Sequence, residues 1–308
     1  MSAPYARRQI NVTFQLGKGS FGASGYDTVT FKSPSTGAPG MRVFAEISSA
    51  QLPQQIRGVI RIYGLTLDHI NQLTNAGRFY EPSRDKILVQ AGDVGGPLAT
   101  VFQGNIIEAY PDFREMPNTA FQILAGPGAI NLKPVEPTSF EGATPAPTAL
   151  GQIAQKCGLS LENNGVNAVL SNPYFPGTGI TQINRALGAA NCFGTIDPVK
   201  NQLAIWPKNG SRSGTPAKIS PETGMIGYPE FQKINVRVRS VFDPALVGIG
   251  PGKKMTVDSQ FTAAQGEWII GQVDLTLASE TPGGPWEMLL TGWRNEGGGT
   301  TAPTGPNV

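Results

Sequence analysis

The sequence predicts a β-rich α+β fold, and three observations lead to this prediction. Apolar residues recur at every second position over most of the chain, as they do in strands with one buried face. The 39 glycines and 26 prolines cluster between these alternating segments, as turn residues do. Helical spacing is largely confined to the middle of the 308 residues, a length that suggests two or three domains.

The first third of the chain reads as a series of short strands. Ile10, Val12 and Phe14 alternate with polar residues and predict the first strand. Gly- and Pro-separated segments of the same kind favour a sandwich or a barrel. These segments are Thr28–Lys32, Met41–Ile47, Ile56–Tyr63, Lys86–Ala91, Val101–Tyr110 and Thr119–Ala125. One helix is expected over residues 67–74, with Thr66 as its N-cap and Gly77 beyond its end.

The middle of the chain predicts a small α/β module. Residues 130–147 are proline-rich without periodicity and are interpreted as a linker or a change of domain. Thr148 is expected to cap a helix over residues 149–158, and a second helix is expected over Gly179–Asn191. Short strands are expected around these helices: Leu159–Glu162, Cys192–Asp197 and Gln202–Trp206.

The last part of the chain returns to strands after a loose stretch at residues 210–224. Ile234, Val236 and Val238 alternate with polar residues, and three further strands are expected: Lys254–Ser259, Glu267–Leu277 and Trp286–Trp293. The closing residues have no apolar anchor and predict a flexible tail. The expected division of the chain is 1–133, 134–212 (the α/β module), 213–296 and the tail 297–308.

Composition and charge exclude several classes of protein. Charged residues make up 15% of the chain, and the net charge of +2 lacks the basic bias of a duplex nucleic-acid binder. No apolar run is long enough to span a membrane, and no apolar region of a secretory signal follows the first basic residues. Two cysteines are too few for a disulfide scaffold. These features fit a protein that is made and folded in a reducing cytoplasm.

Two glycine-rich motifs suggest phosphate chemistry, but both lack the residues that it needs. Residues 16–22 resemble the glycine-rich loop of protein kinases, yet the other kinase motifs are missing, so a hairpin is favoured. Residues 248–254 resemble a phosphate-binding loop but carry Val247 and Lys254 where glycine and Ser or Thr are required. A Pro-Gly turn before a strand explains this second motif better.

Nucleophilic and metal chemistry has weak support. His69, the one histidine, is expected on a helix surface, and no nucleophile motif accompanies it. Cys157 and Cys192 could be near one another, and plain burial is favoured while a disulfide and a metal site stay open.

A glycoside hydrolase is a further possibility that the residues do not distinguish from a structural protein. Acidic pairs among Glu81, Asp85 and Asp93 look no different from solvated surface acids. Three tryptophans suggest a sugar platform but lie in alternating strand patterns, where core or interface packing is commoner: Trp268, Trp286 and Trp293. No catalytic, cofactor-binding or metal residue is therefore predicted.

A basic pattern near the C-terminus is the one candidate site. It comprises Lys233 and four residues that are expected at an interface or lumen: Arg237, Arg239, Lys253 and Lys254. Arg237 and Arg239 share one strand face whose opposite face is apolar. A solvated sheet face and a subunit interface or channel wall explain this pattern equally well.

An ordered set of segments resembles the baseplate hub proteins of phages and related contractile tails. The N-terminal members are Val59–Leu65, Asn71–Thr74, Lys86–Gly92 and Val101–Ala109. The C-terminal members are Gly227–Pro229, Phe242–Pro244, Pro251–Gly252, Glu267–Ile270 and Trp286. The resemblance covers most of the chain except the tail, although no single motif is specific. One departure is that many relatives carry a histidine in the strand Val273–Leu277, and this chain has none.

The resemblance implies two tube-like antiparallel β-barrel domains, one on each side of the α/β module. It implies a homotrimer that presents six similar units in a ring, docks a hexameric tail tube on one side and a trimeric central spike on the other, and continues the DNA channel. The implied partners are further copies of the chain, the tail tube protein, the spike and other baseplate proteins. DNA would pass transiently, without sequence-specific binding, and no membrane and no cofactor are implied. The location implied is the tail baseplate of the virion, after synthesis in the host cytoplasm.

Three alternatives remain open at the level of the sequence. Another tail-tube or baseplate component would be favoured by a hexamer. A β-rich cell-wall or polysaccharide hydrolase would need an acidic pair in a cleft. A receptor-binding module is disfavoured because no fibre-like repeat is present.

Overall fold

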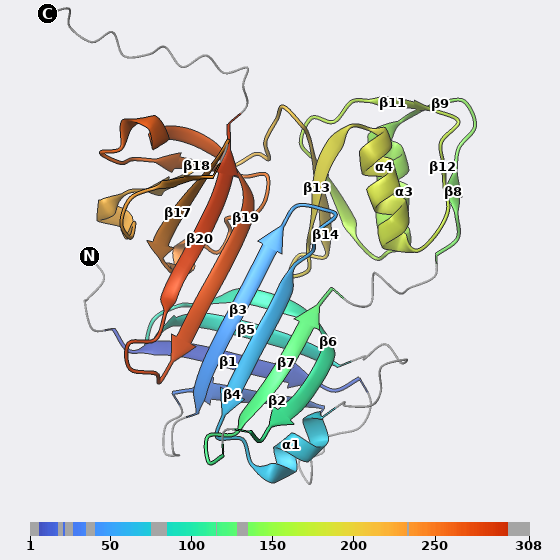
Figure 1. The fold of residues 1–308 in the computed structure, drawn as a ribbon. Helices are drawn as coiled ribbons and strands as arrows, with labels where there is room; N and C mark the ends of the chain where they lie inside the picture. The colour runs from blue at the N-terminus through green and yellow to red at the C-terminus, as the bar shows by residue number, and fades with distance from the viewer. Residues whose placement is uncertain are drawn as a thin grey trace, which may run out of the picture.

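The computed structural model describes residues 6–17, 21, 27–34, 41–74, 85–114, 116–127, 135–232 and 234–294. The described chain is β-rich, with a large, mainly antiparallel sheet and three α-helices (Figure 1). The helices are α1 (Leu67–Leu73), α3 (Ala146–Lys156) and α4 (Gly179–Ala189). No helix in these ranges is long and apolar enough to cross a membrane.

The N-terminal part consists of seven strands and α1. The strands are β1 (Arg8–Gln15), β2 (Thr28–Ser33), β3 (Arg42–Ala50), β4 (Arg57–Tyr63), β5 (Lys86–Asp93), β6 (Leu98–Asp112) and β7 (Ala120–Gly126). Strands β3, β4 and β7 form a layer in front of β1, β2 and β5 (Figure 1). Phe14, Ile60 and Phe102 are fully buried in the core between these layers. The predicted strands are confirmed, and so is Thr66 as the N-cap of α1, while Gly77 lies outside the described residues.

The C-terminal part contributes the other six strands of the large sheet. They are β15 (Ala217–Ile219), β16 (Glu230–Gln232), β17 (Asn235–Val241), β18 (Lys254–Val257), β19 (Gly266–Ser279) and β20 (Trp286–Trp293). Their buried side chains form a second core that includes Val238, Trp268 and Leu290. Residues 210–224 were expected to be loose, but β15 lies within them and pairs with β18 in parallel. The predicted tail at 297–308 lies outside the described residues.

One strand joins the two β-rich parts into a single sheet. Gln272–Ser279 of β19 pair antiparallel with Val43–Ala50 of β3, although more than 200 residues of chain separate them. The sheet order is β16-β17-β20-β19-β3-β4-β7-β6-β5-β1-β2, with β18 and β15 beside the first half of β19. Within the described ranges this path is open at β16 and β2 and closes no barrel. The two β-rich parts, which the resemblance implies to be two separate barrels, are therefore parts of one continuous sheet.

The α/β module lies beside the upper end of the sheet and has its own core. Its strands are β8 (Thr138–Ser139), β9 (Ala143–Pro145), β10 (Ser160–Asn163), β11 (Val169–Ser171), β12 (Tyr174–Phe175), β13 (Cys192–Asp197) and β14 (Gln202–Pro207). Leu150 and Ile153 of α3 pack with Ile183 of α4 in this core. The module is thus present as predicted, while the domain boundaries drawn from the sequence stay predictions.

The interpretation of residues 130–147 as a linker is wrong for their second half. Strands β8 and β9 pair there with β12 and β11, and α3 begins at Ala146 with Pro145 as its N-cap, so Thr148 is not the cap. Proline is compatible with the first turn of a helix and with edge strands, so a proline-rich sequence does not exclude either element.

Candidate assembly surfaces

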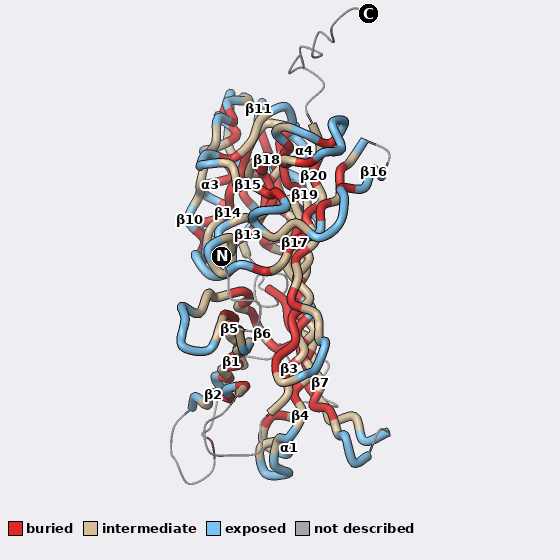
Figure 2. The backbone as a smooth tube through the Cα atoms, turned by 90° about the vertical axis from the view of Figure 1, so that its left-hand side faces the viewer, coloured by how far each residue is buried: buried red, intermediate tan, exposed pale blue. Residues whose placement is uncertain are grey.

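Among the described residues, no helix or strand packs on one face of the β20–β19–β3–β4–β7 portion of the large sheet (Figure 1). In β3, Val43, Ala45 and Ile47 are buried in the core, whereas Phe44 and Glu46 alternate with them on the other side. Figure 1 looks onto this second side, and no helix or strand lies in front of β20, β19, β3, β4 and β7. Figure 2 shows the same strands edge-on, with β1, β2 and β5 to one side of them. We call this side the open face.

The open face runs unbroken across both β-rich parts. Its side chains come from alternate positions of five strands whose opposite positions are buried: Arg237, Arg239, Glu287, Leu289, Thr291, Asp274, Thr276, Phe44, Glu46, Ser48, Arg57, Val59, Arg61 and Tyr63. The strand register places Arg239 opposite Leu289, and Asp274 opposite both Leu289 and Ser48. A single surface therefore spans the β17–β4 portion of the sheet.

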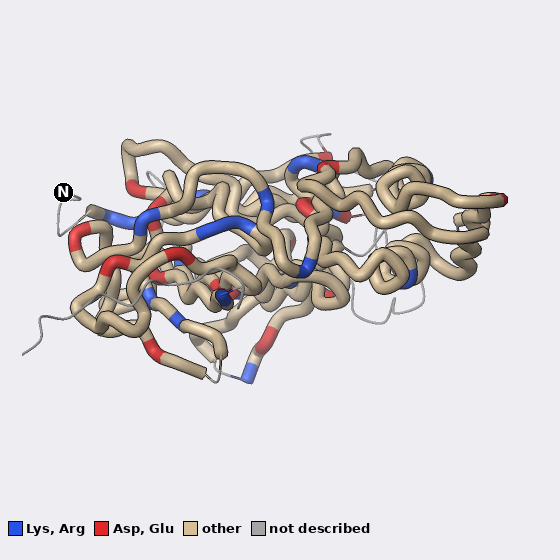
Figure 3. Tube along the Cα trace, turned by 90° about the horizontal axis from the view of Figure 1, so that it is seen from above, with Lys and Arg blue, Asp and Glu red and all other residues tan. Residues whose placement is uncertain are grey.

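Stacking and hydrogen bonds fix several side chains of the open face. The Arg42 guanidinium lies 4.5 Å from the Tyr63 ring centre, and that of Arg61 lies 5.4 Å from the Phe44 ring centre. The Gln272 amide donates to Asp274 at 2.9 Å. Positive and negative side chains are mixed on this face, which suits contact with other surfaces. Figure 3 shows that basic and acidic residues are also intermixed along the chain as a whole, seen from above.

The structure divides the predicted basic pattern among three places. Arg237 and Arg239 lie on the open face of β17, where Arg239 forms an exposed ion pair with Glu287 at 3.7 Å. Lys254 pairs with Glu267 at 2.9 Å on β18. Lys253 instead lines a cavity that is partly open to solvent, and Lys233 lies outside the described residues. Lys253 precedes β18, which begins at Lys254, so the two neighbouring lysines belong to different elements.

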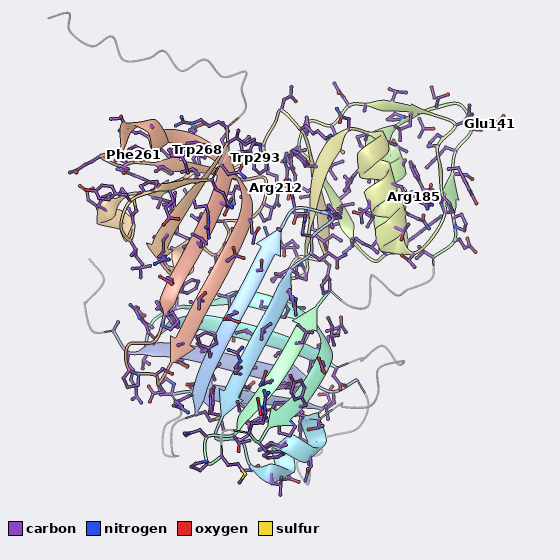
Figure 4. The ribbon with its side chains drawn as sticks, viewed as in Figure 1. Glu141, Arg185, Arg212, Phe261, Trp268 and Trp293 are labelled. Atoms are coloured by element: carbon purple, nitrogen blue, oxygen red, sulfur yellow. The ribbon has the colours of Figure 1, made fainter. Side chains whose placement is uncertain are left out.

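An exposed apolar patch borders the edge strand β16 and was not predicted. Phe231 packs edge-to-face against Phe261 and Trp268, with ring centres 5.8 and 5.9 Å apart. Tyr228 and Ile234 beside this cluster are 68% and 74% exposed. We call the four exposed residues Tyr228, Phe231, Ile234 and Phe261, together with the buried Trp268 that contacts Phe231, the edge patch. Figure 4 labels Phe261 and Trp268. Exposed apolar groups beside an unpaired strand edge are typical of a contact surface.

A two-point ion pair joins the module to the C-terminal part. The Arg212 guanidinium donates to both carboxylate oxygens of Glu162, at 3.0 and 2.9 Å, and also donates to the Pro251 carbonyl. The Arg212 side chain is 5% exposed, and Figure 4 shows it between the module and the sheet. Hydrogen bonds from Arg212 lower the pKa of Glu162 to about 2, against the opposing effect of burial. We regard this pair as structural, because the carboxylate of Glu162 and the guanidinium of Arg212 satisfy one another's charge and hydrogen bonds.

The residues considered for nucleophilic or metal chemistry are dispersed. His69 is hydrogen-bonded to Thr66 and packs against Phe31, with ring centres 5.0 Å apart. No disulfide joins Cys157 and Cys192, and burial raises the pKa of the Cys192 thiol to about 11. The described ranges hold no His, Cys, Asp and Glu cluster that could bind a metal ion.

The carboxylates and tryptophans considered for hydrolysis serve as structural groups. Asp85 accepts a hydrogen bond from the Gly17 amide at 2.8 Å, and Asp93 pairs with Arg8, whereas Glu81 lies outside the described residues. Trp268 and Trp286 are buried in the sheet cores. The glycine-rich motif at 248–254 is a Pro-Gly turn before β18, as expected.

The comparison with protein families decides what kind of protein presents these surfaces. The sequence model of the baseplate hub gp41 family matches residues 10–282, which is most of the chain. The chain belongs to this family of phage baseplate hub proteins. This match confirms the resemblance drawn from the sequence. Because the family is a structural family and not an enzyme family, the hydrolase alternative loses its basis. No curated protein sequence matches the chain.

Solved structures share the fold of this hub protein at low sequence identity. The tail protein from Neisseria meningitidis is 9% identical with a TM-score of 0.62, and the match covers 93% of this chain and 96% of that one. The 43 kDa tail protein of prophage MuSo2 from Shewanella oneidensis is 10% identical with a TM-score of 0.57, and the match covers 94% and 97%. In the lidded PdpA–VgrG complex from Francisella, a chain of 10% identity and TM-score 0.52 is matched over 98% of this chain and 54% of its own length.

Proposed function

We propose that this hub protein forms a homotrimeric ring that joins a hexameric tail tube to a trimeric central spike in a contractile phage tail. The observation that carries the proposal is the continuous sheet, in which β19 and β3 fuse both β-rich parts under one open face. Two β-rich parts in each of three chains supply six sheet segments. Such a ring matches six-fold symmetry on the tube side and three-fold symmetry on the spike side.

The open face supplies the wall of the DNA channel in this proposal. Its charges have mixed sign, and the whole chain carries a net charge of only +2, so DNA would meet no strongly attractive basic surface. A weakly charged wall lets DNA pass, because phosphate binding grows with the number of basic contacts. Arg237 and Arg239 act here as part of the wall, and Lys254 as a surface residue paired with Glu267.

The edge patch supplies the contact between neighbouring chains. Strand β16 ends the sheet path, so its outer backbone groups have no strand partner in the described chain. Exposed strand edges are natural places for pairing with another chain. The apolar side chains around β16 would be buried by such pairing, which adds hydrophobic stabilisation to the backbone hydrogen bonds.

The fold neighbours support partners of the same kind. One neighbour is a chain of a complex that contains PdpA and VgrG, and two others are tail proteins. We infer that the chain binds the tail tube protein, the spike and other baseplate proteins. We also propose that the chains together complete tube-like barrels, two for each chain, around the three-fold axis.

The proposal is tested by measuring the mass and symmetry of the purified protein with the tail tube protein and the spike protein of the same phage. Native mass spectrometry should find three copies of the chain, and electron-microscopy class averages should show a ring with an open centre. A hexamer would favour another tube or baseplate component. A chain that remains monomeric with both partners present would rule out the hub.

A further inference from the structure

A cavity of about 250 Å³ lies where the three parts of the chain meet. The sheet contributes Val273, Leu275 and Met288 to its wall, and the module contributes residues 195–200, which are the end of β13 and the turn that follows it. The segment 246–251 covers it from the C-terminal part. All of these contributions except the turn are mainly apolar. The cavity is not part of the open face or of the edge patch, so the proposed hub function gives it no role.

The segment 246–251 that covers the cavity combines aliphatic side chains with glycines. Leu246, Val247 and Ile249 are half-buried, and Gly248 and Gly250 have open space where a side chain would lie. Apolar side chains that are held half-buried over a cavity leave an apolar interior that water solvates poorly. An apolar ligand would therefore gain free energy by filling this space.

The charged side chains of the cavity wall carry an excess of positive charge. They are Asp197, Lys200, Arg212 and Lys253. Arg212 is neutralised by Glu162, and the Asp197 carboxylate accepts hydrogen bonds from the backbone amides of Val199 and Lys200 at 3.0 and 3.1 Å. With Glu162 included, three cations face two carboxylates.

Lys253 is the half-buried cation that these interactions leave without a counter-ion, whereas Lys200 is exposed to solvent. Within the described ranges the Lys253 ammonium group forms no hydrogen bond and no ion pair, although the residue is half-buried. Burial lowers its pKa, and the nearby charges of Arg212 and Lys200 lower it further, whereas Glu162 and Asp197 raise it. A half-buried cation without a counter-ion is stabilised by an anion that hydrogen-bonds to it.

We propose that this cavity binds an amphipathic carboxylate of medium chain length, with its head group at Lys253 and its alkyl chain between the sheet and the 246–251 segment. The volume of the cavity sets the length of the alkyl chain. A water-sized group occupies about 30 Å³, so a cavity of about 250 Å³ holds an alkyl chain of roughly eight carbons. The ligand class follows from an apolar interior and from Lys253, the half-buried cation at its wall that has no counter-ion within the described residues.

The first test compares three probes on the full wild-type chain by isothermal titration calorimetry. Octanoate should bind with one molecule per chain. 1-Octanol has the same chain without the charge and should bind about tenfold more weakly, and butyrate has the charge without the chain and should bind more weakly still. Octanol binding as tightly as octanoate, or no octanoate binding, would overturn the proposal without any variant being needed.

The second test uses neighbouring lysines as a matched pair. Lys253→Gln should weaken octanoate binding about tenfold and leave octanol binding unchanged, because only the head-group contact is removed. Lys254→Gln should change neither, since Lys254 pairs with Glu267 and does not line the cavity. Val247→Phe should fill the cavity and weaken both probes. Circular dichroism confirms that each variant is folded, and equal octanoate affinity in the two lysine variants would contradict the assignment.

Discussion

At the scale of single residues, close contacts between the three parts explain why certain side chains cannot change. Gly252 has a positive φ of 83°, and a Cβ atom there would lie 2.7 Å from ring atoms of Trp206. Trp206 is fully buried in the module, whereas Gly252 belongs to the turn before β18. The backbone of the C-terminal part therefore packs directly on an aromatic ring of the module, and glycine alone fits.

Gly252→Ala should destabilise the protein by about 2–5 kcal/mol, because it adds steric overlap to the cost of the positive φ. Gly283→Ala is the matched control, since Gly283 has a φ of 66° with open space around it. The control should cost about 1 kcal/mol from the backbone alone. Urea unfolding measures both values, and equal costs would show that the contact with Trp206 is unimportant.

The Glu162–Arg212 pair makes stability depend on acid pH. The pKa of Glu162 is lowered from 4.5 to about 2 in the folded chain, so its stabilisation is present above pH 4.5 and is lost as the pH falls towards 2. Glu162→Gln should lower the melting temperature at pH 7 and flatten its dependence on pH in that window. Melting curves from pH 7 to pH 2.5 measure this effect. An identical pH dependence in wild type and variant would contradict it.

At the scale of elements, β19 couples the two β-rich parts. Its first half packs in the C-terminal core through Trp268 and Ile270, while Leu277 near its end is buried in the N-terminal core. Leu275 between them contacts both cores. Because one strand contributes side chains to two cores, a substitution that loosens the packing of one core should also destabilise the other.

Leu277→Ala should cost about 2–5 kcal/mol through the cavity that it leaves. Amide hydrogen exchange should then increase in both β3 and β20, because both pair with β19. Leu203→Ala, at an equally buried position of the module, should increase exchange mainly in β10 and β13, which pair with its strand. Faster exchange confined to β3 in Leu277→Ala would refute the coupling.

The sequence predicted elements well and their long-range pairing poorly. Period-two alternation located the longer strands of the large sheet, because that signal is local, but it missed the three-residue strands β15 and β16. The pairing of β19 with β3 leaves no local signal, and two- or three-residue strands such as β8 and β12 are too short for alternation to show. The basic pattern was found in the sequence. The different environments of Lys253, which lines the cavity, and Lys254, which pairs with Glu267, depend on where β18 begins, and the sequence does not show this start.

At the scale of the whole molecule, low charge and exposed apolar groups fit a protein that is covered by its neighbours. Charged residues make up 15% of the chain, and interface cores are depleted in charge. The edge patch is the surface that the proposal assigns to such contacts, whereas the open face is assigned to the channel wall. Both extend over elements that the sequence separates widely, so neither could be assembled from the sequence alone.

Replacing Tyr228 and Ile234 together by serine should weaken self-association by about tenfold or more, because both side chains would be buried between chains. Monomer stability should change by less than about 0.5 kcal/mol, since both are exposed. Leu67→Ser is the matched control, as Leu67 is 65% exposed on α1, away from β16. Sedimentation velocity measures the association, and equal effects of the two changes would exclude the edge patch as the interface.

The most direct test of the hub is a cryo-electron-microscopy reconstruction of the intact tail that contains this chain. We predict three copies in one ring between the last tube ring and the spike, with β3, β4, β19 and β20 turned towards the channel. Six copies, or a position outside the axis of the tail, would contradict the account.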